Sequence, residues 1–302
     1  MTAQADDMVT TIPSSVAAAR TLLFVPGDRP DRFAKAQAAG AGAIILDLED
    51  AVGAASKNDA RATVLQWLQQ REGRGSVGVR LNAIDTLFGL DDLAAFARAA
   101  RGPDFYVLSK IESAAAVRLY ADHLCATDGG VQLVCAIETA KGLDAASRIA
   151  SASPSVVMLG FGGGDLAGHL GTDGSDEAML FARSRVVQAA AAAGRVALDM
   201  PWIHLDDLQG LVGDARRSRA LGFRAKLAIH PRQVPLLEQA LGPAPEEMAK
   251  ARRIIDAYRS AQGGACTVEG QLVDAANYGA ALRLLGEAGH LGRTAVERET
   301  RI

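Results

Sequence analysis

Eight short aliphatic runs recur along this chain of 302 residues, and each is followed by a segment with helical periodicity. Such runs are apolar on both faces, as the strands of a parallel sheet covered by helices must be. Eight strand–helix repeats favour a closed barrel over an open doubly wound sheet, so we predict a (β/α)8 TIM barrel. The runs are TLLFVP (21–26), AIILDLE (43–49), SVGVRLN (76–82), FYVLSK (105–110), VQLVCAIE (131–138), VVMLGFG (156–162), RVALDMP (195–201) and RAKLAIH (224–230).

The glycine-rich segments also favour a barrel over a nucleotide-binding sheet. The first run continues as PGDRPDR (26–32) and the sixth as GFGGGD (160–165), and neither matches GxGxxG or a P-loop. Helical patterns at 244–261 and 274–287 predict extra C-terminal helices beyond the barrel. We therefore predict three parts: a flexible N-terminal segment (1–19), the barrel as catalytic domain (20–240), and a C-terminal helical extension and tail (241–302).

Composition excludes several classes of partner. The net charge is −3, no basic block occurs, and only 5% of residues are aromatic, so we expect no nucleic-acid partner and no membrane surface. The three cysteines form no CxxC pair, which is typical of a reducing compartment. The first twenty residues lack a signal-peptide core, and no run of about 18 apolar residues follows. We therefore expect a cytoplasmic protein.

Charged residues gather where the predicted strands end, which is the end that carries the active site in such barrels. The second run ends on Asp47, Glu49 and Asp50, three carboxylates that repel one another and gain nothing from burial. They predict cationic partners, namely Arg80 after the third run and a hydrated metal ion. The carboxylates would then hold metal-bound waters, and Lys110, after the fourth run, would lie beside them.

Two other carboxylates are better candidates for direct contact with a metal. Glu138 and Asp165 follow the neighbouring fifth and sixth runs. Few ligands, all of them oxygen, suit Mg²⁺, which keeps several waters and leaves room for substrate oxygens. The glycines before Asp165 carry no side chain, so a substrate can approach the backbone closely at Gly164.

The cationic side chains suit anionic parts of a substrate. Arg80 offers a planar fork for a carboxylate, and Arg29 and Arg32 lie where they could meet the phosphates of a large acyl carrier. Structural roles stay open for several of these residues. Arg29 and Arg32 could form a solvated helix face, Glu49 and Asp50 could cap the next helix, and Lys110 could pair with Glu112 or an acid of the second run.

Nine segments, in order from about Thr21 to Leu285, resemble the citrate lyase β-subunit-like family of the HpcH/HpaI aldolase superfamily. The paired blocks AIILDLEDAV and AIETAKG, in that order, make the resemblance specific. The segments are LFVPGDRPDRFAKA, GAGAIILDLEDAV, KNDAR, VRLNAIDT, SKIESAAAV, AIETAKG, LGFGGGDLAGHLG, FARSRVV and KLAIHPRQV.

The resemblance implies an Mg²⁺-dependent lyase that cleaves, or forms by condensation, a 3-hydroxyacyl-CoA such as malyl-, citramalyl- or citryl-CoA. Its products would be acetyl-CoA and a 2-keto acid. By resemblance, Arg80 holds the substrate carboxylate, Glu138 and Asp165 bind Mg²⁺, and Asp274 is the acid/base, supplied by a neighbouring subunit in some relatives. A homo-oligomer, with a trimer as first guess, is implied. In the VDxP-like motif around Asp274, this chain has Ala276 in place of proline.

Three alternatives remain possible on the residues alone. A class II aldolase acting on free 2-keto acids without CoA would use the same metal pair. A Schiff-base aldolase would use Lys110, provided that its pKa fell in a desolvated pocket. The third alternative is a subunit of a larger complex, or a barrel that has lost its activity. A citrate lyase subunit would depend on partner subunits and would receive its acyl group from a carrier protein.

Overall fold

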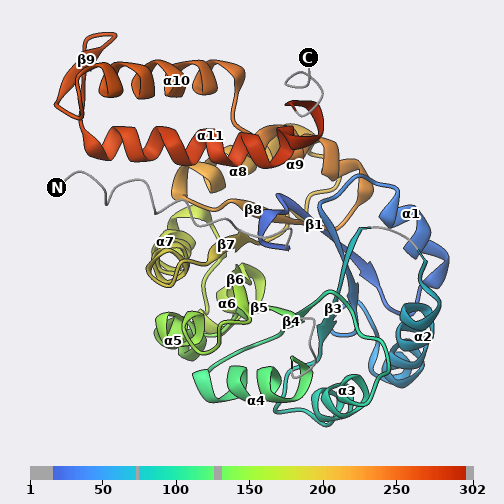
Figure 1. Cartoon of the computed structure of the whole chain (residues 1–302). Coiled ribbons are helices and arrows are strands. Elements are labelled where there is room, and N and C mark those ends of the chain that lie inside the picture. Colours follow the sequence, from blue (N-terminus) through green and yellow to red (C-terminus); the bar gives the residue numbers. More distant parts are fainter. Residues whose placement is uncertain (1–15, 73–74, 126–130, 297–302) are drawn as a thin grey trace. The chain divides into compact units, whose positions relative to one another are not determined.

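The first of two compact units in the chain is a closed barrel of eight parallel strands in sequence order (Figure 1). The computed structural model describes residues 16–72, 75–125 and 131–296. Each of the eight predicted runs forms one strand, so the predicted TIM barrel is confirmed. The strands are β1 (Thr21–Pro26), β2 (Ala43–Asp47), β3 (Ser76–Leu81), β4 (Phe105–Leu108), β5 (Gln132–Ile137), β6 (Val156–Phe161), β7 (Val196–Asp199) and β8 (Ala225–Ala228).

Helices follow the strands, as the periodicity predicts, and α2 spans Lys57–Gln70, the same residues as the helical pattern in that part of the sequence. Two helices of this unit were not predicted, α6 and α9. The first begins inside the run of glycines, whose low helix propensity suggests a loop. The helices are α1 (Phe33–Gln37), α2 (Lys57–Gln70), α3 (Leu87–Ala97), α4 (Ala114–Leu124), α5 (Ala140–Ala150), α6 (Gly163–Leu170), α7 (Asp176–Ala192), α8 (Leu208–Leu221) and α9 (Val234–Leu241).

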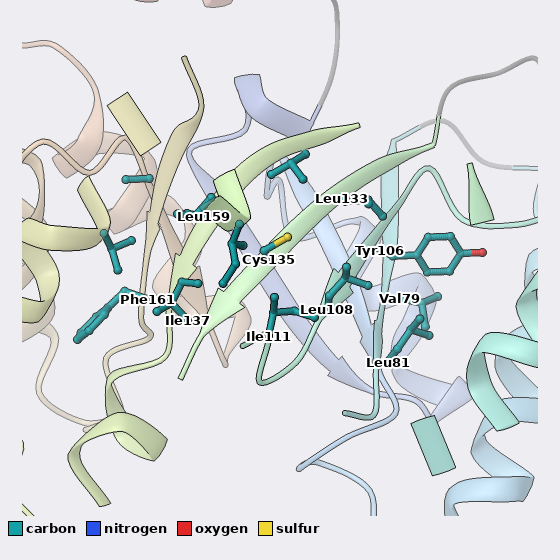
Figure 2. Close-up of a cluster of buried hydrophobic side chains, with 14 of the residues drawn as sticks. Val79, Leu81, Tyr106, Leu108, Ile111, Leu133, Cys135, Ile137, Leu159 and Phe161 are labelled. Atoms are coloured by element: carbon teal, nitrogen blue, oxygen red, sulfur yellow. The ribbon is translucent and has the colours of Figure 1, made fainter. Parts of the chain in front are cut away.

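Alternate residues along every strand except β3 enter two separate apolar clusters, and the buried apolar residues of β3 all belong to one of them. The inner cluster contains strand side chains such as Phe105, Val107 and Leu198, and no residue of the long helices, so it fills the barrel. The outer cluster joins the other strand face to helix residues such as Val117. Figure 2 shows ten labelled members of this outer cluster, from β3, β4, β5, β6 and Ile111. Strands buried on both faces explain why the runs lack polar alternation.

The predicted flexible segment 1–19 is described only in part, because residues 1–15 lie outside the described residues. Val16–Ala18 forms a short 3-10 helix, and Val16 is buried in the inner cluster. Its backbone N–H donates to Oε1 of Gln132 at 2.9 Å. The described end of that segment is therefore packed against the barrel.

The second compact unit spans Gly242–Ile302. It contains α10 (Pro245–Ser260), an antiparallel hairpin of β9 (Cys266–Val268) and β10 (Gln271–Val273), and α11 (Ala275–Val296). The two helices match the predicted C-terminal helices, whereas the hairpin was not predicted. Tyr258 and Tyr278 stack between α10 and α11 with ring centroids 4.7 Å apart. None of the described helices has the length and hydrophobicity that a membrane span requires.

Candidate active site

Arg80 and Asp47 form the first part of the site, on neighbouring strands. Asp47 is the last residue of β2 and lies opposite Arg80 in the β2–β3 register. Arg80 Nε and Nη2 donate to Oδ1 and Oδ2 of Asp47 at 2.7 and 2.6 Å. The same carboxylate accepts the backbone N–H groups of Glu49 and Ala51, at 2.9 and 3.1 Å. Asp47 therefore holds both the guanidinium and the turn after β2 in place.

The other two carboxylates after β2 also face Arg80. Its Nη1 lies 2.8 Å from Oε2 of Glu49 and 3.4 Å from Oδ2 of Asp50, and its guanidinium lies over the ring of Phe24. The predicted pairing of these acids with Arg80 is therefore present. The alternative, a cap on the next helix, is not what Glu49 and Asp50 do, since Gly53 stands at the start of the short helix that precedes α2.

Lys110 connects the acids after β2 with those after β5 and β6. Its Nζ lies 2.5 Å from Oε1 of Glu49, 3.3 Å from Oδ2 of Asp165 and 3.8 Å from Oδ1 of Asp50. Its backbone N–H donates to Oε2 of Glu138 at 2.7 Å. Of the two predicted ion pairs for Lys110, the one with the acids after β2 forms. Glu112 instead pairs with Lys141, at 2.8 Å.

Glu138 directly follows β5 and is almost fully buried, with 5% of its surface exposed. Burial, followed by the negative charge of Glu49, raises the pKa of this carboxyl to about 7. Gly162, which follows β6, makes room for it, because a Cβ at that position would overlap Cγ of Glu138. A buried carboxylate that is held beside another acid is well suited to contact a cation.

Asp165 comes from the first turn of α6, four residues after the end of β6. Its side chain is 45% exposed, in contrast to Glu138. The adjacent glycines differ in what surrounds them: a Cβ on Gly163 would overlap Sδ of Met200, whereas one on Gly164 would have no heavy atom within 4 Å. The space beside Gly164 is thus available for a ligand.

A network of polar side chains forms hydrogen bonds with the segment at the end of β2 that carries the three acids. Lys57 Nζ donates to the carbonyls of Leu48 and Glu49 and to Oδ1 of Asn82, at 2.9, 2.8 and 2.6 Å. Asn82 in turn donates from Nδ2 to Asp92, which is paired with Arg61 at 2.6 Å. Reasoning from strand ends missed Lys57, Arg61 and Asp92, although Lys57 and Arg61 begin and end the segment KNDAR.

The charge of the site is not balanced. We call Asp47, Glu49, Asp50, Arg80, Lys110, Glu138 and Asp165 the mouth cluster; it has five carboxylates and two cations. The buried Oε2 of Glu49 has no hydrogen-bond partner within the described residues, although Arg80 lies within ion-pair distance. In the described chain no three His, Cys, Asp or Glu side chains form a metal-ligand group. A two-carboxylate oxygen site with surplus negative charge fits Mg²⁺, which keeps most of its waters.

Two residues at predicted strand ends lie outside this cluster. Asp199, at the end of β7, belongs to a second charged group, which we call the wall cluster: Arg183, Asp199, Asp214, Ser218 and Lys226, from α7, α8, β7 and β8. His230 follows β8 and acts as a helix cap, since its Nδ1 accepts the N–H of Arg232 at 3.1 Å. Asp199 therefore contradicts the expectation that charged residues at the strand ends gather at one site, whereas His230 has a structural hydrogen-bonding role.

The remaining predicted residues have local partners of their own. Arg29 forms a two-pronged ion pair with Asp31, at 2.9 and 2.7 Å, and Arg32 is exposed at the end of the same short helix, Pro30–Arg32. Asp274, in the second compact unit, caps α11: its Oδ1 accepts the N–H groups of Ala276 and Asn277, at 2.9 and 3.1 Å. The sequence did not predict this capping role.

The chain also matches known proteins over most of its length. Residues 20–231 match the family model described as HpcH/HpaI aldolase/citrate lyase. A citrate lyase subunit beta-like protein of Mycobacterium tuberculosis is 39% identical over 259 residues, covering 83% of this chain and 89% of the relative. The human mitochondrial citramalyl-CoA lyase is 30% identical over 275 residues, covering 84% of this chain and 81% of that enzyme.

A solved structure gives the same assignment. The protein CitE from Mycobacterium tuberculosis, in complex with magnesium, acetoacetate and coenzyme A, superposes with a TM-score of 0.78 at 38% sequence identity. The match covers 90% of this chain and 99% of that structure. The sequence matches therefore cover 81% or more of each relative, and the structural match covers 99% of the solved chain. The chain belongs to the HpcH/HpaI aldolase/citrate lyase family.

Proposed function

We propose that this protein is an Mg²⁺-dependent carbon–carbon lyase. It cleaves a 3-hydroxyacyl-CoA such as malyl-, citramalyl- or citryl-CoA to acetyl-CoA and a 2-keto acid, or forms one by condensation. The observation that carries the proposal is the mouth cluster. In it, Glu138 accepts the backbone N–H of Lys110, Asp165 pairs with the ammonium of Lys110, and carboxylates outnumber cations. The relatives named for citramalyl-CoA cleavage and for a complex with magnesium and coenzyme A support it.

Glu138 and Asp165 would hold the metal. When bound, Mg²⁺ supplies positive charge that stabilises the negative charge developing on substrate oxygens. Glu138 is fixed for this task by the N–H of Lys110 and by the space that Gly162 leaves. The room beside Gly164 would receive the keto-acid part of the substrate.

Arg80 would orient the substrate through its carboxylate. Hydrogen bonds to Asp47 and Asp50 take three of the five N–H donors of its guanidinium, so donors remain for a ligand. The two bonds to Asp47 fix the plane of the guanidinium before a substrate arrives. A fixed fork holds the reacting bond in one orientation and lowers the entropic cost of reaction.

Asp274 would act as acid/base from a neighbouring subunit of a homo-oligomer, with a trimer as first guess. In cleavage, the Asp274 carboxylate would take the proton of the substrate hydroxyl, the carbon–carbon bond would break, and the same carboxyl would give that proton to the departing acetyl-CoA carbon. Both capping bonds go to Oδ1 of Asp274, so its Oδ2 is not used by the cap. Arg29 and Arg32 would meet the phosphates of CoA.

The negative charges around Lys110 are unfavourable for a Schiff-base mechanism on this residue. Burial lowers the pKa of Lys110, but the hydrogen bond to Glu49 and the charges of Glu49 and Glu138 outweigh burial and raise the pKa above its ordinary value. An amine that stays protonated is not a nucleophile. Lys110 is therefore better suited to a role as a fixed cation.

The test is a panel assay of acetyl-CoA release from malyl-, citramalyl- and citryl-CoA, each with Mg²⁺ and with EDTA. We expect Mg²⁺-dependent release from at least one substrate and a loss of about 10³-fold or more in Glu138→Ala. Glu112→Ala, which removes a carboxylate outside the mouth cluster, is the matched control and should stay within about threefold. Release that persists in EDTA would contradict the metal role. Aldol cleavage of free keto acids without any acyl-CoA activity would identify a class II aldolase instead.

A further inference from the structure

Lys110 occupies an unusual place for a lysine in a metal-dependent site. Its ammonium lies 3.3 Å from the candidate ligand Asp165 and 2.5 Å from Glu49, while its backbone N–H binds the other candidate ligand, Glu138. One residue therefore contacts both candidate ligands through two different groups. The side chain is 32% exposed, so it has an open path to move toward solvent.

The backbone at Lys110 is held in a conformation that lysine disfavours. Its φ is +49°, and within the described part of the barrel unit it is the single non-glycine residue with a positive φ. Such a conformation persists where surrounding contacts fix it, and it is common at functional sites. Here it aims the N–H at Glu138 and the side chain at Glu49 and Asp165.

The charge of the mouth cluster explains what the ammonium does there. Without a metal, five carboxylates share two cations, and Arg80 is already bound to the three acids after β2. The ammonium of Lys110 is then the counter-ion that Asp165 contacts. A divalent cation on Asp165 would bring two further positive charges next to that ammonium, and like charges at such distances repel.

We infer that Lys110 is the resident counter-cation of the candidate metal site and sets its affinity by competing with the divalent ion for Asp165. On metal binding, the ammonium leaves Asp165 and keeps its contact with Glu49. The backbone N–H of Lys110 stays on Glu138 with and without the metal. Glu138 therefore keeps its position, whereas Asp165 exchanges the ammonium of Lys110 for the metal ion. This role rests on the proposed function, because it requires Glu138 and Asp165 to be the metal ligands.

Calorimetric titration of the metal-free full-length protein with MgCl₂ tests this role without a turnover assay. Lys110→Asn removes the charge, and asparagine tolerates the left-handed backbone at this position. We expect it to bind Mg²⁺ about tenfold or more tightly than the wild type. Lys110→Arg keeps the charge and should stay within about threefold. Lys141→Asn removes an equal charge outside the mouth cluster and should also stay within about threefold.

Two further variants separate the possible failures. If the asparagine variant folds poorly, Lys110→Gly can replace it, because it removes the same charge and glycine adopts this backbone conformation most readily. Unchanged or weaker Mg²⁺ binding in the neutral variants would overturn the counter-cation role and leave Lys110 a structural ion pair. If Glu138→Ala binds Mg²⁺ as tightly as the wild type, the proposed metal site itself is wrong. Loss of binding in Glu138→Ala without tightening in Lys110→Asn would reject only the role of Lys110.

Discussion

The barrel unit contains two clusters of charged side chains that differ in balance and in exposure. In the wall cluster, Lys226 Nζ lies 2.8 Å from Asp199 and 2.6 Å from Asp214, and Arg183 lies 2.6 Å from Asp199. These two cations and two carboxylates are each 4% exposed or less. In the mouth cluster, five carboxylates face two cations, and Asp50 and Asp165 are 59% and 45% exposed.

This difference supports the proposal that the mouth cluster is functional and the wall cluster structural. The wall cluster neutralises itself between α7, α8 and the barrel, so it has no charge left for a ligand. The mouth cluster has surplus negative charge and a path to solvent, and both are costly unless a cation completes the site. Three pairs of substitutions test this comparison, from the largest expected effect to the smallest.

Lys226→Met should lower the free energy of unfolding by about 3–5 kcal/mol, because the change leaves buried Asp199 and Asp214 with too little positive charge. Urea denaturation followed by circular dichroism measures the loss. Lys110→Met is the matched change in the mouth cluster, and its cost should be about 1 kcal/mol or less since the side chain is partly solvated. Equal losses in the two variants would remove the distinction between the clusters.

Glu138→Gln should stabilise the metal-free protein at high pH and have little effect at low pH. The pKa of Glu138 is raised to about 7 in the folded protein from its ordinary 4.5, so the folded state keeps a proton that the unfolded state has lost. Wild-type stability therefore falls as the pH rises from about 4.5 to 7, by up to about 3 kcal/mol. Glutamine carries no such penalty and still accepts the N–H of Lys110.

Urea denaturation in EDTA at pH 5 and pH 8 measures this difference between wild type and Glu138→Gln. We expect a gain of up to about 3 kcal/mol at pH 8 and less than about 1 kcal/mol at pH 5. An equal gain at both pH values would mean that packing, rather than ionisation, is responsible. Glu112→Gln, at a half-buried carboxylate outside the mouth cluster, should show no such gain at pH 8.

Arg80→Lys and Arg183→Lys form a pair that sharpens the comparison. Lysine cannot reproduce the two parallel bonds that Arg80 makes to Asp47. Arg80→Lys should therefore lower kcat/KM about 10- to 100-fold, or about 1.4–2.7 kcal/mol of transition-state stabilisation. Arg183→Lys in the wall cluster should lower the melting temperature and leave kcat/KM within about threefold. Steady-state kinetics decides, and similar kinetic losses in both variants would contradict the separation.

Much of the barrel could be predicted from the sequence, because strand and helix signals are local. All eight strands form within the predicted runs, and α2 spans the same residues as the helical pattern in that part of the sequence. Where local signals conflict with tertiary contacts the prediction failed. The helix α6 starts at Gly163 despite its glycines, since the chain must turn directly after β6 beside Glu138 and Met200.

The sequence does not show to which side of the sheet a residue at the end of a strand points. In RVALDMP one alternating set is Val196, Leu198 and Met200, and the other contains Arg195, Ala197 and Asp199, but the letters do not reveal which set faces the barrel interior. In the closed barrel Leu198 lies in the inner cluster, and the next residue, Asp199, therefore points to the helices. In β3, Val79 and Leu81 belong to the outer cluster, which leaves Arg80 directed toward the mouth.

By itself the sequence determined the repeated strand–helix order, the acids and cations at the strand ends, and the family to which the chain belongs. The sequence also predicted that the acids of the second run meet Arg80 and Lys110, but only the tertiary structure decided which other charges, such as Asp199, lie apart from them. Asp47, Arg80 and Lys110 lie in different runs, and they come together because closing the sheet brings the carboxyl ends of its strands to one mouth. Charge balance depends on those distances, so the ligand-ready mouth cluster and the self-neutralised wall cluster can be told apart only in the folded barrel.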